Sequence, residues 1–176
     1  MKKAASIFLR ANMEQADIYR LSDWMENREV TRFLNEDDNS PRELRRLAET
    51  TLEPMLACRF NQRGRFFLIC DDKEDSIGFV RLSCQDAPDC YEVVFAIGEE
   101  ALWGNGYGTQ ALRAAQARAF FDWRAKKLTA KIYHRNLRSK LTVQSCGFRE
   151  EQRLEKLSRY SITMGEYLDF LEQKRA

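Results

Sequence analysis

Apolar residues recur at two different spacings along this chain, and the change of spacing separates predicted helices from predicted strands. Ile18, Leu21 and Met25 follow one another at spacings of three and four residues, which predicts one apolar face of a helix. Asn12 can cap the start of this helix, and residues 7–10 before it predict a short strand. The chain therefore opens with a strand followed by a helix.

The segment Ser40-Pro41-Arg42-Glu43 carries the signals of a second helix start. Ser40 suits the cap position, Pro41 the first helical position and Glu43 the acidic position of a capping box. We expect the helix to run to about Phe60. Pro54 lies inside this stretch and should kink or divide the helix, because proline has no backbone N–H to donate.

Strand-like segments dominate the middle of the chain. Residues 65–70, 77–83 and 90–97 are rich in apolar and β-branched residues, and short polar turns separate them. Consecutive strands joined by short turns pair antiparallel, so these segments predict an antiparallel meander.

A helix and another strand follow the meander. Apolar residues recur at helical spacing from Leu112 to Trp123, and residues 128–133 alternate between apolar and polar. A strand–helix–strand unit of this kind forms a right-handed crossover between parallel strands. The sheet should therefore contain a parallel pair as well as antiparallel pairs.

The last part of the chain predicts one more helix and two more strands. Residues 136–146 predict a short helix that Gly147 ends. Residues 148–153 and 158–164 are strand-like, and the tail from Gly165 is helical and charged.

The order of these elements predicts an α/β fold of the layered α+β type, with a central mixed, mostly antiparallel sheet and helices on both faces. The length of 176 residues suits one domain. We expect a single domain over residues 1–176, with a core at about 7–164 and a helical tail at 165–176.

Composition narrows the classes of partner and site. The chain contains 29 Lys and Arg, 27 Asp and Glu, a formal net charge of +2 and a single His, His134. No block of five or six like charges occurs, which argues against nucleic acid or a charged membrane surface as a partner. One His excludes a site with several His ligands, and the five Cys form no Cys-x-x-Cys pair, so we expect no metal site.

The chain also lacks segments typical of export or membrane insertion. No apolar run approaches the roughly 18 residues that a membrane span needs. The N-terminal residues include no apolar stretch of signal-peptide length, and an odd number of Cys argues against a secreted disulfide framework. We therefore expect a cytoplasmic protein with no membrane partner.

The most informative motif is Trp103-Gly104-Asn105-Gly106-Tyr107-Gly108-Thr109, between a predicted strand and a predicted helix. Glycines allow the backbone to turn tightly and to approach a ligand closely. The first N–H groups of the following helix then point at one place, backed by the positive end of the helix dipole. Such a turn binds phosphate without Lys or Arg side chains. The alternative is a tight turn that starts a helix and holds no ligand.

Two nucleotide motifs fit this region poorly. Residues 106–111 fit Gly-x-Gly-x-x-Ala, the fingerprint of dinucleotide-binding folds. That fingerprint needs an acid about 20 residues further on to hold the ribose, whereas this chain has Lys126, Lys127 and Leu128 there. The Gly-Lys-Ser/Thr of a Walker site is also missing from the sequence.

The pattern Trp103-x-x-Gly106-x-Gly108 resembles the Gln/Arg-x-x-Gly-x-Gly/Ala signature of the GNAT superfamily of acyl-CoA-dependent N-acetyltransferases. Trp103 departs from the signature, since the family has Gln or Arg there. The Trp-Gly-x-Gly-Tyr form is similar to the branch that contains ribosomal-protein N-terminal acetyltransferases. Further segments that resemble this branch follow in its order over nearly the whole chain: Leu9-Arg10 to Glu29-Val30-Thr31, Ile77-Gly78-Phe79, Tyr91-Glu92-Val93, Asn136-Leu137-Arg138-Ser139 and Cys146-Gly147-Phe148.

The resemblance implies transfer of an acetyl group from acetyl-CoA, as acyl-donor cosubstrate, to a primary amine on a protein N-terminus or a small molecule. It places the pyrophosphate of the cofactor on the glycine turn and the pantetheine arm between two strands that splay apart. Asn136 would contact that arm, and it also suits the cap of the helix that follows. The implied cofactor-binding residues are Phe95, Ala96, Ile97, Trp103, Gly104, Asn105, Gly106, Tyr107, Gly108, Thr109, Asn136 and Ser139.

Glu92 is the candidate general base. An amine must be neutral to attack, and a Lys-like amine with a pKa near 10.4 is only about 0.04% neutral at pH 7. Glu92 lies on an apolar strand and matches an acid of the branch, so it could accept the proton directly or through a water. The alternative is an ordinary solvent-facing strand residue.

Protonation of the departing sulfur has a weaker candidate. Many family members use a Tyr at the position of Val143, which cannot donate a proton. Ser139 matches a Ser of the branch and could donate a hydrogen bond, or it simply solvates the first helical turn. Cys84 and Cys146 are predicted as small core residues, and His134 as structural or as part of the acceptor mouth.

Two functions of different classes remain open from the sequence. The first is an N-acetyltransferase, and the second is a CoA-binding regulatory or interaction module that lacks efficient catalysis, for which Val143 leaves room. The acidic residues Glu36, Asp37 and Asp38 could attract a cationic acceptor or form a solvated loop. The resemblance also allows a homodimer.

Overall fold

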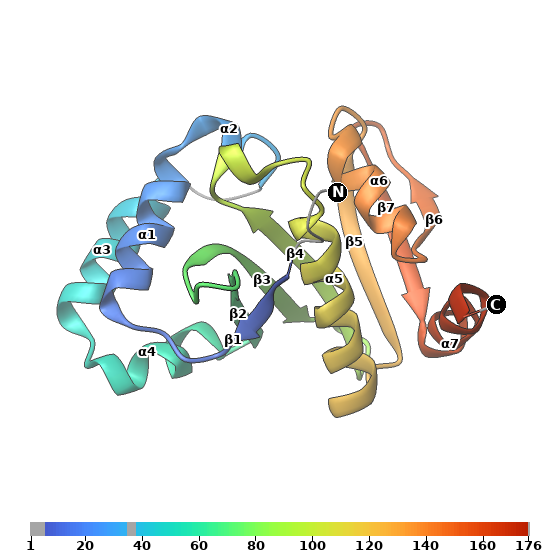
Figure 1. The fold of residues 1–176 in the computed structure, drawn as a ribbon, viewed down its shortest axis with the longest axis horizontal. Coiled ribbons are helices and arrows are strands. Elements are labelled where there is room, and N and C mark those ends of the chain that lie inside the picture. The colour runs from blue at the N-terminus through green and yellow to red at the C-terminus, as the bar shows by residue number, and fades with distance from the viewer. Residues whose placement is uncertain (1–5, 35–37, 176) are drawn as a thin grey trace.

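The structure, a computed structural model, describes residues 6–34 and 38–175. Its strands form one sheet in the order β1-β2-β3-β4-β5-β7-β6, with helices on both faces (Figure 1). The strands are β1 (Phe8–Arg10), β2 (Gly64–Cys70), β3 (Ser76–Cys84), β4 (Cys90–Ile97), β5 (Lys127–Tyr133), β6 (Arg149–Arg153) and β7 (Leu157–Thr163). The helices are α1 (Gln15–Glu26), α2 (Arg28–Thr31), α3 (Ser40–Thr50), α4 (Glu53–Phe60), η1 (Glu100–Leu102), α5 (Tyr107–Ala117), η2 (Arg118–Asp122), α6 (Leu137–Ser145) and α7 (Met164–Arg175).

This architecture confirms the predicted fold class. The strands β2, β3 and β4 pair antiparallel in sequence order, as the predicted meander requires. The crossover through α5 places β5 parallel to β4, and β7 then pairs antiparallel with β5. The sheet is therefore mixed and mostly antiparallel.

The predicted start of the first helix was wrong by a few residues. Asn12 does not cap α1; Glu14 occupies the cap position, and the backbone N–H of Glu14 donates to Oδ2 of Asp17 at 2.9 Å. Asp17 is also held by Arg10, whose Nη2 lies 2.8 Å from Oδ1. A carboxylate in the first helical turn, fixed by a strand residue, therefore sets where the helix begins.

The second helix divides as the proline predicted. The chain leaves helical geometry after Thr50, and Pro54 lies in the first turn of α4, where its missing N–H costs nothing. Asn39 rather than Ser40 precedes the first helical residue. The short helix α2 was not predicted, since four residues are too few to show a helical period.

The sheet separates two hydrophobic cores, because successive strand residues point to opposite faces. Phe67 and Ile69 pack on the face covered by α5, in a core that we name the α5-side core. Phe66 and Leu68 pack on the face covered by α1, α3 and α4, in the α1-side core. Strand β2 is thus buried on both faces.

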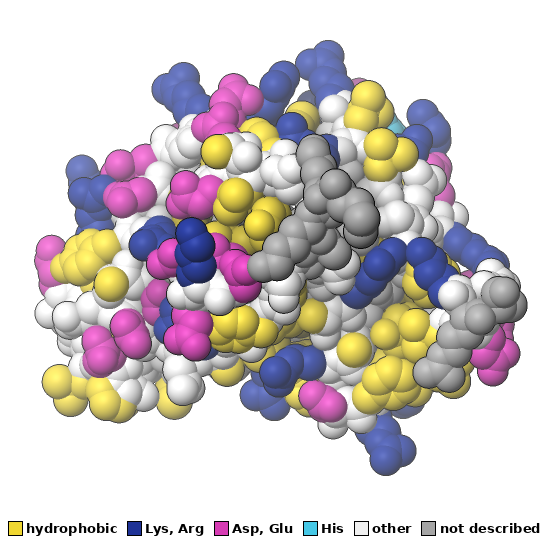
Figure 2. Space-filling view, in the orientation of Figure 1, with side chains coloured by type: hydrophobic (Ala, Val, Ile, Leu, Met, Phe, Trp, Pro, Cys, Tyr) yellow, Lys and Arg dark blue, Asp and Glu magenta, His cyan; other side chains and the backbone are white. Residues whose placement is uncertain are grey.

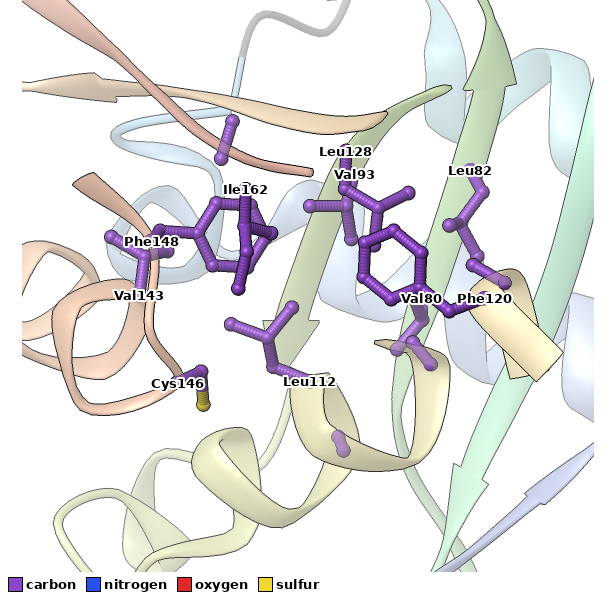
Figure 3. Close-up of a cluster of buried hydrophobic side chains, with 14 of the residues drawn as sticks. Val80, Leu82, Val93, Leu112, Phe120, Leu128, Val143, Cys146, Phe148 and Ile162 are labelled. Carbon is purple, nitrogen blue, oxygen red and sulfur yellow. The ribbon is translucent and has the colours of Figure 1, made fainter. Parts of the chain in front are cut away.

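Figure 3 shows part of the α5-side core. Leu112 of α5 lies among strand side chains such as Leu128, while Val143 of α6 and Cys146, the residue that caps the end of α6, reach into the same core beside Phe148. All of these side chains are buried. One continuous core therefore fixes α5 and α6 against the sheet, which positions the residues of the site described next.

Helix α7 begins with a capping box that the sequence analysis did not identify. The backbone N–H of Thr163 donates to Oε2 of Glu166 at 2.8 Å, and the N–H of Glu166 donates back to Oγ1 of Thr163 at 3.3 Å. The hydrogen bond from the Thr163 backbone lowers the pKa of Glu166 below its ordinary value. The tail is therefore anchored to β7.

The surface shows both charge signs. On the face in Figure 2, acidic and basic side chains both occur, with hydrophobic side chains between them. None of the described helices is long and apolar enough to span a membrane. Within residues 6–34 and 38–175, no group of three His, Cys, Asp or Glu side chains is arranged to hold a metal ion.

Candidate functional site

The parallel strands β4 and β5 are paired only near their beginnings. Cys90 to Glu92 pair with Lys127 to Thr129. Beyond this point, β4 continues to Ile97 along β3, and β5 continues to Tyr133 along β7. The two strands therefore separate, and none of the described strands pairs with the last part of β4 on the β5 side.

The glycine turn lies directly before α5. Gly104 and Gly106 have φ angles of 77° and 88°, in the left-handed region where a side chain is strained. An added Cβ at either position would meet no atom within 4 Å, so space alone does not demand glycine there; the backbone conformation does. The two glycines are thus required by the left-handed backbone conformation of the turn.

This geometry presents backbone N–H groups. Gly106 caps α5, and the first residue in the helical ladder is Gln110, whose N–H donates to the Gly106 carbonyl. The N–H groups of Tyr107, Gly108 and Thr109 precede that bond and have no acceptor within the helix. N–H groups at a helix start are able to bind an anion, which is the role predicted for this turn.

One cavity of about 680 Å³ joins the turn to the strand opening. The predicted cofactor residues that line it are Phe95, Ala96, Ile97, Trp103, Gly104, Gly106, Tyr107, Gly108, Thr109, Asn136 and Ser139. Asn105 does not line it; its Nδ2 donates to the carbonyl of Leu102 at 3.2 Å, within the turn. The structure thus brings together the turn, the end of β4 and the start of α6.

Trp103 has a defined place in this cavity. Its Nε1 donates to the carbonyl of Ile97 at 2.8 Å, so this β4 carbonyl is already engaged. The guanidinium of Arg138 lies over the indole, 4.2 Å from the ring centroid, at cation–π distance. A Trp at the position where the signature has Gln or Arg is therefore paired with a cation supplied by α6.

Basic residues of the cavity were missed by the sequence analysis. Arg32, Arg135 and Arg138 line it, and Glu29 is the acidic residue among the described lining residues. The positions of Arg135 and Arg138 on either side of Asn136 were a usable signal, since that segment was already assigned to the site. Arginines at the cavity suit phosphate groups.

Asn136 and Ser139 are linked to each other. The side-chain oxygen of Asn136 accepts the backbone N–H of Ser139 at 3.2 Å, so Asn136 caps α6 as its structural alternative predicted. Both side chains also line the cavity. The cap uses the oxygen of the amide, which leaves its NH₂ group to donate elsewhere.

Glu92 lies outside the cavity. Its Oε2 forms an ion pair with Nζ of Lys131 at 2.8 Å, and the Glu92 side chain is 19% exposed. Glu92 pairs with Thr129 across the strands, so Lys131 is the diagonal neighbour two residues further along β5. Glu92 is thus neither a free strand residue nor part of the cavity lining.

The remaining candidates have mostly structural environments. Val143 is fully buried with its side chain in the α5-side core, so it does not face the cavity. Burial raises the pKa of the Cys146 thiol, as expected for a core residue. Cys84, by contrast, is exposed, because β3 ends there beyond the core, which corrects its predicted burial. Nε2 of His134 lies 2.9 Å from the carbonyl oxygen of Leu154, a contact between the residue that follows β5 and the β6–β7 turn.

The residues of the cavity fit an acyl-CoA. Backbone N–H groups and arginines suit its phosphates, and the partnerless edge of β4 can pair with the amides of an extended arm. The volume is in the range of cavities that hold a cofactor-sized ligand. Donors suited to phosphate and an opening between strands thus border the same cavity.

Comparison with known proteins bears on these observations. Residues 7–149 match the family model of the acetyltransferase (GNAT) domain. The fold is similar to that of a spermidine N-acetyltransferase from Vibrio cholerae in complex with CoA and spermine, with a TM-score of 0.77, 21% identity, and coverage of 92% of this chain and 98% of that one.

Two further solved structures share the fold. An aminoglycoside acetyltransferase in complex with coenzyme A has a TM-score of 0.75 and 17% identity, over 97% of this chain and all (100%) of that one. A GNAT-family acetyltransferase from Bacillus anthracis has a TM-score of 0.72 and 15% identity, over 93% and 98% of the two chains. No curated protein sequence matches the chain.

Proposed function

Because the chain belongs to the GNAT acetyltransferase family, we propose that it transfers the acetyl group of acetyl-CoA to a primary amine, on a protein N-terminus or a small molecule, by direct attack. Membership makes the chain an acyltransferase with acetyl-CoA as cosubstrate. The proposal concerns the acceptor, the residues and the route of the reaction.

One observation carries the proposal. The N–H groups at the start of α5 and the free edge of β4 border the cavity of about 680 Å³ described above, which we name the cofactor cavity. A phosphate-binding turn alone would suit many anions, and a strand opening alone would suit many peptides. Their combination supports a ligand that has a phosphate at one end and an extended amide-containing arm at the other.

The proposed reaction needs few side chains of the protein. Bound acetyl-CoA supplies a thioester carbonyl that a neutral amine can attack. The new N–C bond replaces the C–S bond, the amine loses one proton and the departing sulfur gains one, so atoms and charge balance. In our proposal the backbone of β4 holds the arm, and the hydroxyl of Ser139 donates a hydrogen bond toward the sulfur.

The proton of the amine needs an acceptor, and Glu92 is our candidate. Because Glu92 lies outside the cavity lining and pairs with Lys131, it would act through a water rather than by direct contact. Lys131 would then orient the Glu92 carboxylate and leave its second oxygen for the water. This assigns a positioning role to Lys131.

A protein N-terminus is one acceptor that the local sequence matches support. The segments around Trp103 and Asn136 are similar to the branch of ribosomal-protein N-terminal acetyltransferases. An α-amine with a pKa near 7.7–8.0 is roughly 10% neutral at pH 7, so it depends less on a base than a Lys-like amine does. This agrees with a base that acts at a distance.

Two measurements on the full chain test the proposal. Calorimetry should detect binding of CoA, and a thiol assay should detect CoA released from acetyl-CoA when amines are supplied. An absence of CoA binding at millimolar concentration would overturn it. Binding without transfer to any amine of a broad panel would instead favour a CoA-binding regulatory module, in line with the buried Val143.

A further inference from the structure

A second cavity lies on the opposite face of the sheet from α5. Its volume is about 450 Å³, and its lining comes from α1, α3, α4, β2 and β3. Three aromatic rings belong to the lining: Phe60 and Phe66 have centroids 4.8 Å apart, and Phe66 stacks on Phe79 at 5.6 Å. Leu44 of α3 faces the same space and is partly buried. The interior is therefore apolar and aromatic.

This cavity is one strand away from the cofactor cavity. Phe79 of β3 pairs directly with Ala96 of β4, and Ala96 lines the cofactor cavity. Directly opposed residues point to the same face of a sheet, and neighbouring strands are about 4.8 Å apart. Leu34 and Trp103 also line the cofactor cavity while packing against the α1-side core. The second cavity thus lies beside the strand that borders the cofactor cavity.

The described lining of the second cavity offers a single carboxylate. Among its described lining residues, Glu43 is the single acid and Arg59 is a base; Glu36 and Asp37, considered above as attractants for a cationic acceptor, lie outside the described residues. A molecule with several ammonium groups needs several carboxylates to offset its loss of hydration. A molecule with one amine at its end and an apolar body needs none in the interior.

We propose that the acceptor is a primary amine carried on a single aromatic or branched aliphatic group, which occupies the second cavity and presents its nitrogen at β4. This inference rests on the proposed acetyl transfer and specifies its acceptor. The nitrogen gains the acetyl carbon and loses one proton, while the sulfur gains one proton as the C–S bond breaks. The same chemistry occurs in free arylalkylamines and in peptides that begin with an aromatic residue.

An acceptor panel on the full chain separates the outcomes. The probes are 2-phenylethylamine, the dipeptide phenylalanyl-alanine, spermidine and an aminoglycoside, with release of the CoA thiol as the readout. We expect kcat/KM at least tenfold higher for one of the two aromatic amines than for spermidine. The ratio of the two aromatic amines identifies a free amine or a peptide as the source. Equal or faster acetylation of spermidine overturns the proposal and leaves the acetyltransferase function standing.

A substitution in the lining of the second cavity provides a second test. Leu44→Glu places a carboxylate against the apolar interior at a partly exposed position, so the fold should tolerate it. We expect kcat/KM for the aromatic amine to fall at least tenfold, with the CoA dissociation constant unchanged. Leu168→Glu on α7, at an exposed leucine outside the lining, is the matched control and should behave as wild type. An unchanged kcat/KM in Leu44→Glu overturns the proposal.

Direct binding distinguishes this proposal from the proposed function. Calorimetry of 2-phenylethylamine and of phenylalanyl-alanine with the CoA-loaded protein does not require turnover. Binding that Leu44→Glu weakens, combined with no transfer to any amine, would overturn the acetyltransferase function and retain the second cavity as an amine site. Absence of binding of both aromatic amines would overturn the cavity proposal.

Discussion

The two cavities on either side of β4 are built in different ways. The cofactor cavity depends on backbone geometry: a glycine turn, the start of α5 and a strand edge without a partner. The second cavity depends on side chains that five separate elements contribute. A site made of backbone groups is constrained by the conformation of the chain, whereas a site made of side chains is constrained by the identity of each lining residue. In our proposals the donor site is therefore defined by the conformation of one turn, and the acceptor site by the side chains of several elements.

The largest expected effect is a loss of CoA affinity caused by a substitution in the glycine turn of the cofactor cavity. Gly108→Asp places a carboxylate at the second position of α5, where acids suit a helix start and the fold should persist. The carboxylate would repel a bound phosphate, so we expect CoA affinity to fall by about 1,000-fold. Calorimetry measures the loss.

Gly108→Ala is the matched control for that experiment. The added Cβ would meet the Phe95 ring at 3.5 Å, an ordinary van der Waals contact, so CoA binding should remain close to wild type. If Gly108→Asp binds CoA within threefold of wild type, the turn does not hold the phosphates.

The next largest effect is a loss of catalytic rate on substitution of Glu92, which lines neither cavity. Glu92→Gln keeps the shape of the side chain and removes its basicity, so kcat/KM should fall by about 100-fold for a Lys-like amine. The loss should be smaller for an α-amine, which is already partly neutral. Lys131→Met should lower the rate less while shifting the pH profile. An unchanged rate in Glu92→Gln would remove Glu92 from the reaction.

A smaller effect tests the cation over Trp103. Arg138→Ala should weaken CoA binding by about tenfold, the scale of one hydrogen bond to a charged group. Affinity in the variant should also depend less steeply on salt. Arg138→Lys retains the charge and should recover part of the affinity. Identical CoA affinities in wild type and Arg138→Ala would show that the stacked arginine serves only the packing of α6.

The smallest effect concerns stability rather than either cavity. Since the pKa of Glu166 is lowered in the folded state, its contribution is present above the ordinary carboxyl pKa and is lost as pH falls through the lowered value. Glu166→Gln should cost about 0.5 kcal/mol near pH 7, because solvent screens this partly exposed carboxylate. Urea unfolding at several pH values should show the difference shrinking in acid. If the difference in unfolding free energy between wild type and Glu166→Gln did not change with pH, the ionised Glu166 carboxylate would not stabilise the start of α7.

The two cavities also differ in what the sequence could predict. The glycine turn is a contiguous motif, so its place before a helix and beside the end of β4 followed from local spacing. The second cavity joins residues as distant as Leu21 and Arg81, and no local pattern marks such a set. The ion pair of Glu92 with Lys131 was equally hidden, because it depends on the register of a parallel pair. The start of α1 was missed because Arg10, on a strand, fixes the capping acid.

The short pairing of β4 with β5 has a mechanical consequence. It joins two antiparallel leaves, β1–β4 and β5–β7–β6, along three residue pairs, and no other ladder among the described strands connects them. Helix α5 packs across this seam, with Leu112 in one core with Val80 of the first leaf and Leu128 of the second. The two leaves are therefore joined by one short ladder and by the packing of α5. A ligand bound at the start of that helix and between the two leaves would contact both of them. It would therefore resist displacement of one leaf along the other at the point where the backbone ladder stops.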